Sequence, residues 1–340
     1  MSTLLSARRV VVTQRLFDAQ ARAFLEQHGC TVSEVELPAG VADGDLGVDV
    51  LRRHLEGAQG WIVGHARVDD ELLRALPALR VIARRGVGHE RVDQDAVRRH
   101  GKVATIAAGG NDAAVADHAI ALMLAVGRRL HEARAQLVVG DWSIPLATEL
   151  YRKTVGVVGL GRIGRGVVRR LRGFEARVLI ATPERDEAFA AEQGARFASL
   201  DELLACADIV SLHAPLTPAT HSLIDAAALT RMKRGAILVN TARGGLVDDA
   251  ALLAALEEGR LGGAGLDVFE SEADPGLQAV THALLRLPQV VATPHAGAST
   301  AESLARTNLI AARCVVQVLD GQTPAAECLL ADGRSPNLSR

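Results

Sequence analysis

Short runs of apolar residues alternate along this chain with longer stretches in which apolar and polar residues are mixed. The runs predict strands at 9–13, 60–64, 80–84 and 102–105, and the mixed stretches predict helices near 17–28, at 70–76 and from about Ala113 to Leu130. Strands that alternate with helices in this way are typical of a parallel sheet with helices on its faces.

A second series of the same kind follows an irregular stretch at 138–150. Its predicted strands are 154–159, 177–181, 208–213, 236–240, 264–269 and 290–294, with helices at 163–172, 186–193 and 248–257, and a last helix covers 299–319. Because the second series is complete in itself, we expect an α/β fold of two Rossmann-like, doubly wound parallel-sheet domains with a cleft between them. The expected domains are 113–296 and 1–112 plus 297–340, with the last helix packed on the latter.

Composition narrows the class of protein. The 340 residues carry a net charge of −2 and no long basic run, which argues against nucleic acid as a partner. Apolar stretches stay below about 18 residues, so no membrane span is expected. The four cysteines are far apart and form no C-x-x-C pair. They therefore suggest buried thiols in a reducing, cytoplasmic compartment rather than disulfides or a metal site.

A glycine-rich segment, Gly159-x-Gly161-x-x-Gly164, lies between a β-branched strand and a helix. Gly159 allows a tight turn, Gly161 lets the backbone approach a pyrophosphate, and Gly164 lets the helix lie close to the strand. The N-terminus of the helix then offers N–H groups to the phosphates. This predicts that 113–296 binds a dinucleotide and that the flavodoxin-like first domain binds the substrate. A tight βα turn without a ligand is the alternative.

The second strand of this half ends without the usual acid. Thr182 lies 18 residues beyond Gly164, where an Asp or Glu usually binds the NAD ribose, and Arg185 follows three residues later. A carboxylate there would repel the 2′-phosphate of NADP, whereas Arg185 can bind it. We therefore expect NAD or NADP as the cofactor and favour NADP slightly, although Glu184 counts against it. Alternatively, Arg185 is a solvated turn residue.

Three polar residues, Arg243, Glu272 and His295, each follow a predicted strand. Loops at the same edge of a sheet converge, so the three side chains can meet. Arg243 can hold a substrate carboxylate and polarise a carbonyl. His295 can exchange a proton with the developing alkoxide, and Glu272 can favour the imidazolium and orient it. The trio suits hydride transfer on a 2-oxo acid, with the nicotinamide supplying the hydride.

The motifs GLGRIG, HAPLTPAT (213–220), NTARGGLVDDAALLAAL, LDVFESE and TPHAGAST occur in this order from 159 to 300. The chain thereby resembles the D-isomer-specific 2-hydroxyacid dehydrogenases, most closely their phosphoglycerate dehydrogenase branch. The resemblance implies that Arg243, Glu272 and His295 are catalytic and that Asp267 lies near the nicotinamide carboxamide. It also implies a homodimer whose arm is the irregular segment 131–150. The remaining cofactor contacts that it implies are Gly159, Gly161, Arg162, Ile163, Gly164, Thr182, Arg185, His213, Pro215, Thr241 and Ala242.

Substrate selection is expected in the first domain. ARRGVGHERVD (83–93) resembles the family loop whose N–H groups hold the substrate carboxylate, with Gly86, Val87 and Gly88 at the turn. Arg84 matches a basic residue that helps to bind phosphate in the phosphoglycerate branch, and Asn111 matches a position that approaches the substrate.

The resemblance leaves three functions open. The leading hypothesis is an oxidoreductase that interconverts 3-phosphoglycerate and phosphohydroxypyruvate. A glyoxylate or hydroxypyruvate reductase is the alternative, because Thr182 and Arg185 suggest NADPH. A corepressor-like regulatory protein that senses NAD(H) is a third possibility. The chain departs from the family pattern at Glu272, which is followed by Ala273-Asp274 rather than by proline, and at His89-Glu90, where Val-Asp is usual.

Overall fold

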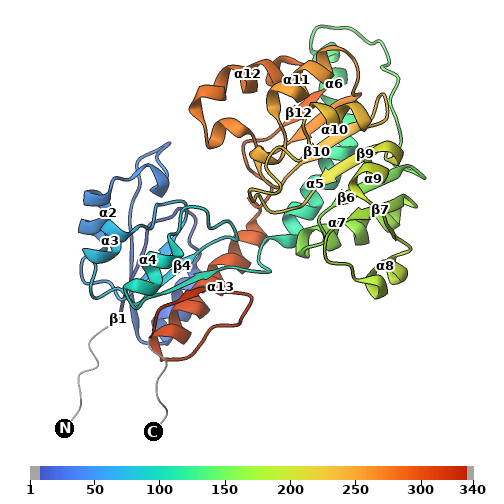
Figure 1. Cartoon of the computed structure of the whole chain (residues 1–340). Coiled ribbons are helices and arrows are strands. Elements are labelled where there is room, and N and C mark those ends of the chain that lie inside the picture. Colours follow the sequence, from blue (N-terminus) through green and yellow to red (C-terminus); the bar gives the residue numbers. More distant parts are fainter. Residues whose placement is uncertain (1–7, 335–340) are drawn as a thin grey trace, which may run out of the picture. The chain divides into compact units, whose positions relative to one another are not determined.

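The computed structural model describes residues 8–334, and the chain forms two compact units. One unit contains the described residues up to Asn111 and from Thr300 onward; the other is Asp112–Ser299. In Figure 1 the first unit runs from blue to teal and ends in red, and the second runs from green to orange. Each contains one sheet.

The sheet of the first unit has the strand order β13-β5-β4-β3-β1-β2. The strands β1 to β5 are all parallel, and their order reverses direction between β1 and β3. β13 pairs antiparallel with β5 and was not expected from the sequence. The bounds are β1 (Arg8–Val12), β2 (Cys30–Glu34), β3 (Gly60–Val63), β4 (Val81–Arg84), β5 (Val103–Ile106) and β13 (Leu329–Asp332).

Helices cover both faces of this sheet. Val10 and Val12 of β1 face α1 and α13, whereas Val11 between them faces the other core. Alternate side chains of a strand point to opposite faces, so a strand buried on both sides is apolar throughout. In Figure 1 α13 lies against β4. The helices are α1 (Ala19–Gln27), α2 (Val48–Leu55), α3 (Asp70–Arg74), α4 (Gln94–Arg99) and α13 (Ala301–Leu319), with a 3₁₀ turn η1 (Asp43–Asp45).

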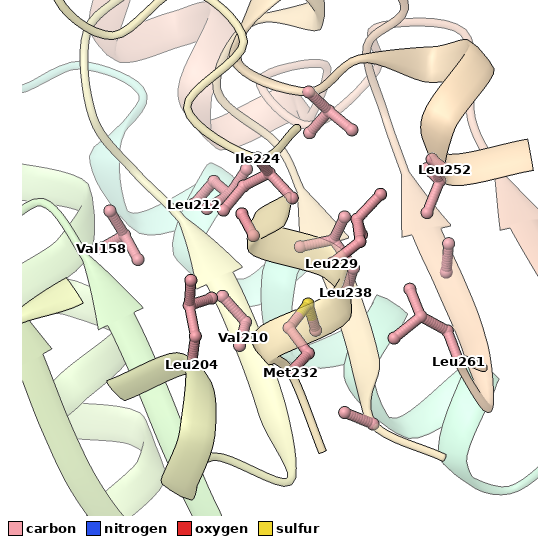
Figure 2. Packing of buried hydrophobic residues seen from close by; sticks show 14 of the residues in the cluster. Val158, Leu204, Val210, Leu212, Ile224, Leu229, Met232, Leu238, Leu252 and Leu261 are labelled. Atoms are coloured by element: carbon pink, nitrogen blue, oxygen red, sulfur yellow. The ribbon is translucent and has the colours of Figure 1, made fainter. Parts of the chain in front are cut away.

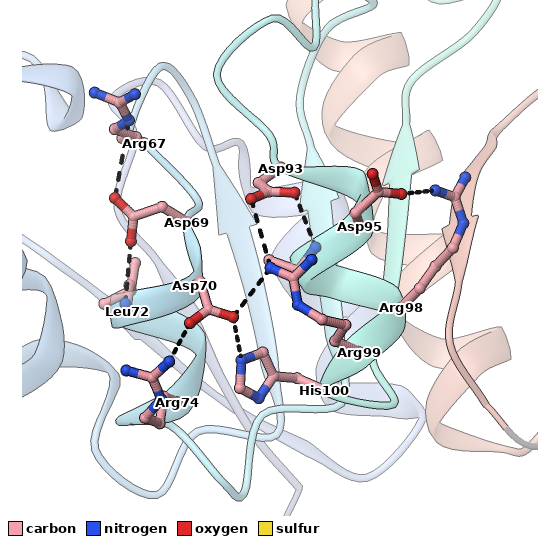
Figure 3. A network of polar contacts seen from close by, with 11 residues as sticks. Arg67, Asp69, Asp70, Leu72, Arg74, Asp93, Asp95, Arg98, Arg99 and His100 are labelled. Carbon is pink, nitrogen blue, oxygen red and sulfur yellow. Dashed lines mark hydrogen bonds and ion pairs between the residues drawn. The ribbon is translucent and has the colours of Figure 1, made fainter.

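A surface network of ion pairs links α3 to α4 (Figure 3). Asp70 at the start of α3 pairs with Arg74, with Arg99 at 3.1 Å and with His100 Nε2 at 3.0 Å. The hydrogen bonds from Arg99 and His100 hold the pKa of Asp70 below its usual value. Since these groups lie at the surface, we assign the network an orienting role for the two helices rather than a large share of the stability.

The sheet of the second unit has seven parallel strands in the order β12-β11-β10-β9-β6-β7-β8. The order reverses between β6 and β9, which is the doubly wound pattern that places ligands at the carboxyl ends of the strands. The bounds are β6 (Thr154–Val158), β7 (Arg177–Ala181), β8 (Arg196–Phe197), β9 (Ile209–Leu212), β10 (Ile237–Asn240), β11 (Gly263–Leu266) and β12 (Val290–Ala292).

Two apolar cores fill the faces of this second sheet. One contains residues of α5, α7 and α8, and the other, drawn in Figure 2, packs Val210 and Leu238 against Leu204, Leu229 and side chains of α11 and α12. The helices are α5 (Asp112–Gly127), α6 (Leu130–Val138), α7 (Arg162–Leu171), α8 (Glu187–Gln193), α9 (Leu200–Cys206), α10 (Ala226–Arg231), α11 (Asp249–Glu257) and α12 (Gln278–Arg286). The 3₁₀ turns are η2 (Arg172–Phe174), η3 (Gly244–Leu246), η4 (Glu270–Glu272) and η5 (Pro275–Leu277).

Three local expectations were wrong. Residues 131–138 belong to helix α6 rather than to irregular chain, because α5 ends at Gly127, Arg129 at φ 52° precedes a new helix, and the following residues favour helix. Cys206 is exposed at the end of α9, not buried. β11 ends at Leu266, three residues before the predicted limit, which leaves Asp267 just past the strand. No helix within 8–334 is long and apolar enough to cross a bilayer.

Candidate active site in the second unit

The glycine turn has the geometry that its sequence predicts. Gly159 has a φ of +94°, and a Cβ there would lie 2.7 Å from the backbone of His213. A Cβ on Gly164 would lie 2.2 Å from the carbonyl oxygen of Gly159, so the helix approaches the turn as closely as a glycine allows. Gly161, at the N-cap of α7, would have no atom within 4 Å of a Cβ and borders open space. The turn therefore fits a pyrophosphate above the first turn of α7, which begins with Arg162 and Ile163.

Two buried polar atoms at the same edge of the sheet support this fit. Within the described chain, Nδ1 of His213 after β9 and Oγ1 of Thr241 after β10 have no hydrogen-bond partner. Buried polar groups are normally paired, so both atoms suit a polar ligand. Nε2 of His213 bonds Ser211 Oγ at 2.8 Å, and burial lowers the pKa of His213 to about 4, which keeps the ring neutral. Pro215 and Ala242 lie two and one residues farther along these loops.

Thr182 begins the loop after β7 and lies beside the glycine turn, because Gly159 N donates to Ala181 O at 2.8 Å. Arg185 is exposed, and its guanidinium lies 5.5 Å from the centre of the Phe197 ring. Two acids flank Arg185 on this loop: Glu184 is exposed, and Asp186 caps α8 and pairs with Arg165 at 2.8 Å. The position of Thr182 itself carries no carboxylate, and the charge of Arg185 is opposed by the neighbouring Glu184.

His295 and Glu272 are in direct contact. His295 Nδ1 lies 2.7 Å from Glu272 Oε2, and the other carboxylate oxygen of Glu272 accepts a hydrogen bond from Phe269 N at 2.9 Å. Their side chains remain 45% and 42% exposed, so both are accessible to a ligand. The hydrogen bond that His295 donates to Glu272 raises the pKa of His295. The pKa of Glu272 is lowered: burial alone would raise it, but the bonds from His295 and Phe269 outweigh that effect.

Arg243 joins this pair electrostatically. It follows β10, and its positive charge acts on His295 against the pull of Glu272. The side chain of Asn240 holds the arginine loop, donating to Arg243 O at 2.8 Å and accepting from Ala242 N at 3.1 Å. One guanidinium nitrogen of Arg243 donates to Ala242 O at 2.7 Å. The structure therefore brings the three predicted catalytic residues to one edge of one sheet.

Asp267 fixes the turn that carries His295. Its buried carboxylate accepts hydrogen bonds from Thr293 Oγ1 at 2.6 Å, Ala296 N at 2.7 Å and Gly297 N at 2.9 Å. Burial alone would raise the pKa of Asp267, but His118, whose Nε2 lies 3.5 Å from Oδ1, and these three bonds outweigh burial and lower it. His295 has a φ of 52°, which is uncommon for a residue with a side chain. The bonds of Asp267 to Thr293, Ala296 and Gly297, here called the clamp, hold the turn in this conformation. The role of Asp267 toward a nicotinamide remains a prediction.

The predicted substrate residues belong to the first unit. Arg84 ends β4, and its guanidinium folds over Gly86, donating to Arg85 O at 3.1 Å and lying 3.4 Å from His65 Nδ1. Gly86 O accepts from Ala107 N at 2.9 Å, which fixes the turn that continues through Val87 and Gly88. Asn111 is buried, and its Oδ1 has no partner within the described chain.

The family of the chain follows from a comparison with family models. The model described as D-isomer specific 2-hydroxyacid dehydrogenase, NAD binding domain, matches residues 120–297. The chain belongs to this family. The matched segment contains the glycine turn, Arg243, Glu272 and His295.

Relatives within the 2-hydroxyacid dehydrogenase family carry more than one name. A D-3-phosphoglycerate dehydrogenase of Mycobacterium bovis is 46% identical over 257 residues, covering 75% of this chain and 48% of that protein. A glyoxylate reductase of Korarchaeum cryptofilum is 40% identical over 263 residues, covering 76% and 78%. The crystal structure of the TT0316 protein from Thermus thermophilus aligns with a TM-score of 0.82 at 38% identity, covering 95% of this chain and 100% of the other. The chain spans about half the length of the curated phosphoglycerate dehydrogenases that head these matches.

Sequence reasoning missed one residue of the site in the second unit and two polar residues in the first unit. His118 of α5 contacts the clamp, with Nε2 at 2.8 Å from Thr293 Oγ1. In the first unit, the buried carboxylate of Asp43 accepts from Gly64 N and His65 N, both at 2.6 Å, and so holds His65 after β3. His65 directly follows the predicted strand 60–64, so its place at a strand end was a usable signal. Asp43 and His118 lie within segments that offer no such signal.

Proposed function

We propose that this protein transfers a hydride between a nicotinamide cofactor and a D-2-hydroxy acid/2-oxo acid pair. The observation that carries the proposal is the His295–Glu272 contact beside Arg243, at the same sheet edge as a glycine turn built for a pyrophosphate. In this proposal the second unit binds the dinucleotide and the first unit selects the substrate.

The site residues would act as follows in the reduction of a 2-oxo acid. The nicotinamide, when bound, supplies the hydride to C2. In the imidazolium form of His295, Nδ1–H donates to Glu272 and Nε2–H is the proton that passes to the carbonyl oxygen. Arg243 binds the substrate carboxylate and stabilises the negative charge that develops on that oxygen. Oxidation of the hydroxy acid runs the same steps in reverse, with neutral His295 accepting the proton.

For the substrate we propose 3-phosphoglycerate and its oxo acid. Arg84 ends β4 in the first unit and Arg85 follows it, and the guanidinium of Arg84 lies 3.4 Å from His65 Nδ1, so basic side chains gather at this edge. A phosphate needs such groups in addition to the N–H groups that hold a carboxylate. The relative named D-3-phosphoglycerate dehydrogenase supports the same choice.

Reduction of glyoxylate or hydroxypyruvate with NADPH is the second candidate. It is favoured by Thr182 and the exposed Arg185, which leave room and positive charge for a 2′-phosphate. The relative named glyoxylate reductase is consistent with it. We favour NADP slightly over NAD on the same grounds.

We also propose a homodimer formed through the arm, defined as residues 131–150. Leu146 and Ile144 are 91% and 94% exposed, and Trp142 is 82% exposed. Monomers rarely expose so many large apolar side chains on one segment, so a second copy is the occupant that we infer. A cytoplasmic location, as the cysteines suggest, remains a prediction.

The test is a set of initial rates with NADH and NADPH against phosphohydroxypyruvate, hydroxypyruvate and glyoxylate. We expect the highest kcat/KM for phosphohydroxypyruvate, and we expect Arg84→Ala to raise its KM roughly tenfold or more while sparing glyoxylate. Arg98→Ala on α4 is the control. Equal effects of Arg84→Ala on both acids would refute the phosphate argument. Tight NADH binding without turnover would instead favour the regulatory function.

A further inference from the structure

Asp249 is a buried acid close to the candidate active site. The proposed mechanism does not use it. It is the first residue of α11 and is 2% exposed. Its N–H donates to Glu270 Oε2 at 2.9 Å, and its Oδ2 accepts from Glu270 N at 3.0 Å. These two reciprocal hydrogen bonds, here called the clasp, tie the start of α11 to η4. Glu272, the partner of His295, is the last residue of η4.

The rest of the segment 269–272 is also held in place. Ser271 Oγ accepts from Thr281 Oγ1 at 2.8 Å, and Glu272 Oε1 accepts from Phe269 N at 2.9 Å. A Cβ on Gly244 would lie 2.1 Å from the backbone of Phe269, so the arginine loop packs directly on this segment. Glu272 has Ala273 and Asp274 after it, where the family pattern has a proline that would stiffen the chain. The two hydrogen bonds of the clasp restrict the backbone of this segment instead.

A capping role does not account for Asp249. The neighbouring Asp248 already caps α11, since its Oδ1 accepts from Ala251 N at 2.9 Å. The buried carboxyl of Asp249 instead points to η4. We propose that Asp249 is a positioning residue that fixes the backbone of η4 so that the carboxylate of Glu272 reaches His295, an inference that rests on the proposed function.

The charges around Asp249 fit this role. Burial, followed by the negative charges of Glu270, Asp248 and Glu272, raises its pKa to about 7 against the opposing hydrogen bond from Glu270 N. Near neutral pH a large fraction of the Asp249 side chains is therefore protonated and uncharged. The protonated carboxyl still accepts the hydrogen bond from Glu270 N and repels its three neighbouring carboxylates less than a charged one would. An asparagine has the same shape and the same acceptor, so Asp249→Asn should preserve the clasp.

Loss of the clasp should appear at His295. The groups that act on this imidazole are Glu272, Asp267 and Arg243, and the hydrogen bond to Glu272 is the main cause of its raised pKa. If η4 moves and this bond weakens, the pKa of His295 falls toward its ordinary value. A variant that only lowers the stability of the fold would leave the pKa of His295 unchanged.

The experiment is an NMR titration of the full chain with ¹³C-labelled histidine, in which the His295 signal is assigned by its loss in His295→Gln. We expect the midpoint to move to lower pH in Asp249→Ala and to stay in place in Asp249→Asn. It should also stay in Glu257→Ala, which removes an exposed acid from the other end of α11. An unchanged midpoint in Asp249→Ala, or an equal shift in Asp249→Asn, would overturn the proposal.

A second pair of variants covers the case in which Asp249→Ala fails to fold. Glu270→Ala removes one bond of the clasp from a partly exposed position, and Glu270→Gln retains it. The midpoint of His295 should fall in the first and not in the second; equal behaviour of the two would count against the clasp.

Kinetics give an independent readout. In oxo-acid reduction we expect Asp249→Ala to lower kcat roughly 10- to 100-fold, with the KM for the cofactor unchanged and the alkaline limb moved to lower pH. The titration itself needs no substrate. It therefore tests the clasp even if the rate measurements refute the proposed dehydrogenase activity.

Discussion

Glu272 divides its two carboxylate oxygens between a backbone N–H and His295, and this division sets the chemistry of the pair. One oxygen holds the acid in its own turn, and the other raises the pKa of the imidazole. The side chain of Arg243 pulls that pKa the other way. The pKa of His295 is thus set mainly by Glu272, with burial and the charge of Arg243 opposing it and the charge of Asp267 adding to it.

The pH dependence of oxo-acid reduction follows from this arrangement. Reduction needs the imidazolium, so kcat/KM should fall as the pH rises through the pKa of His295. Glu272→Gln removes the interaction that raises this pKa, so the fall should begin at a lower pH. His295→Gln should lower kcat by ~10²–10⁴ and remove the limb. Rate profiles between pH 5 and 10 provide the measurement, and an unmoved limb in Glu272→Gln would contradict the assignment.

The choice of cofactor also belongs to the residue scale. Arg185→Ala should weaken NADPH binding roughly tenfold or more and leave NADH nearly unchanged, because a charge-assisted hydrogen bond to the 2′-phosphate would be lost. Arg177→Ala is the matched control, since Arg177 is an exposed arginine at the opposite end of β7. Dissociation constants from fluorescence titration decide between the outcomes. Equal losses for both cofactors would show that Arg185 does not read the phosphate.

At the scale of elements, the turn between β6 and α7 depends on how closely a helix can approach a strand. Gly164 is the point of closest approach, because its missing Cβ makes room for the carbonyl of Gly159. The sequence identified this turn in full, since a strand, three spaced glycines and a helix are all local features.

Gly164→Ala should therefore strain the turn. A new Cβ would have to move a backbone carbonyl, and overpacking of this kind typically costs about 1–3 kcal/mol. We expect a lower Tm and a higher Kd for the cofactor. Gly173→Ala is the control, because a Cβ at Gly173 would have no atom within 4 Å. Thermal unfolding with and without NADH measures both effects; matching behaviour of the two variants would refute the close-approach argument.

At the scale of the whole molecule, most of the exposed large apolar side chains within residues 8–334 lie on the arm. Its helix α6 has no buried residue, and the following segment exposes Trp142, Ile144 and Leu146. A second copy that covers these side chains would bury their apolar area, which is the main driving force of association.

If the proposed homodimer forms through the arm, Leu146→Asp should convert it into monomers at micromolar concentration, because a carboxylate would have to be buried in an apolar interface. Leu285→Asp on α12 is the control, since Leu285 is 47% exposed but lies outside the arm. Sedimentation equilibrium of the two variants gives the answer. A wild-type chain that is monomeric at the same concentration would refute the proposed homodimer.

The sequence by itself determined the α/β class, most strands and helices, the glycine turn and the three candidate catalytic residues. Apolar periodicity records which residues are buried, and short motifs record backbone geometry, so both can be read locally. It also led correctly to the family, through motifs that lie in one order along the chain.

Only the tertiary structure decided which polar groups meet. Asp249 and Glu270 are 21 residues apart, and His118 and Thr293 are 175 apart, yet each pair shares hydrogen bonds. The antiparallel strand β13 likewise exists only through its pairing with β5. Such contacts depend on strand order and loop packing, which no local pattern encodes. The physical reason is that a hydrogen bond needs positions accurate to a fraction of an ångström, whereas periodicity specifies only which face is buried.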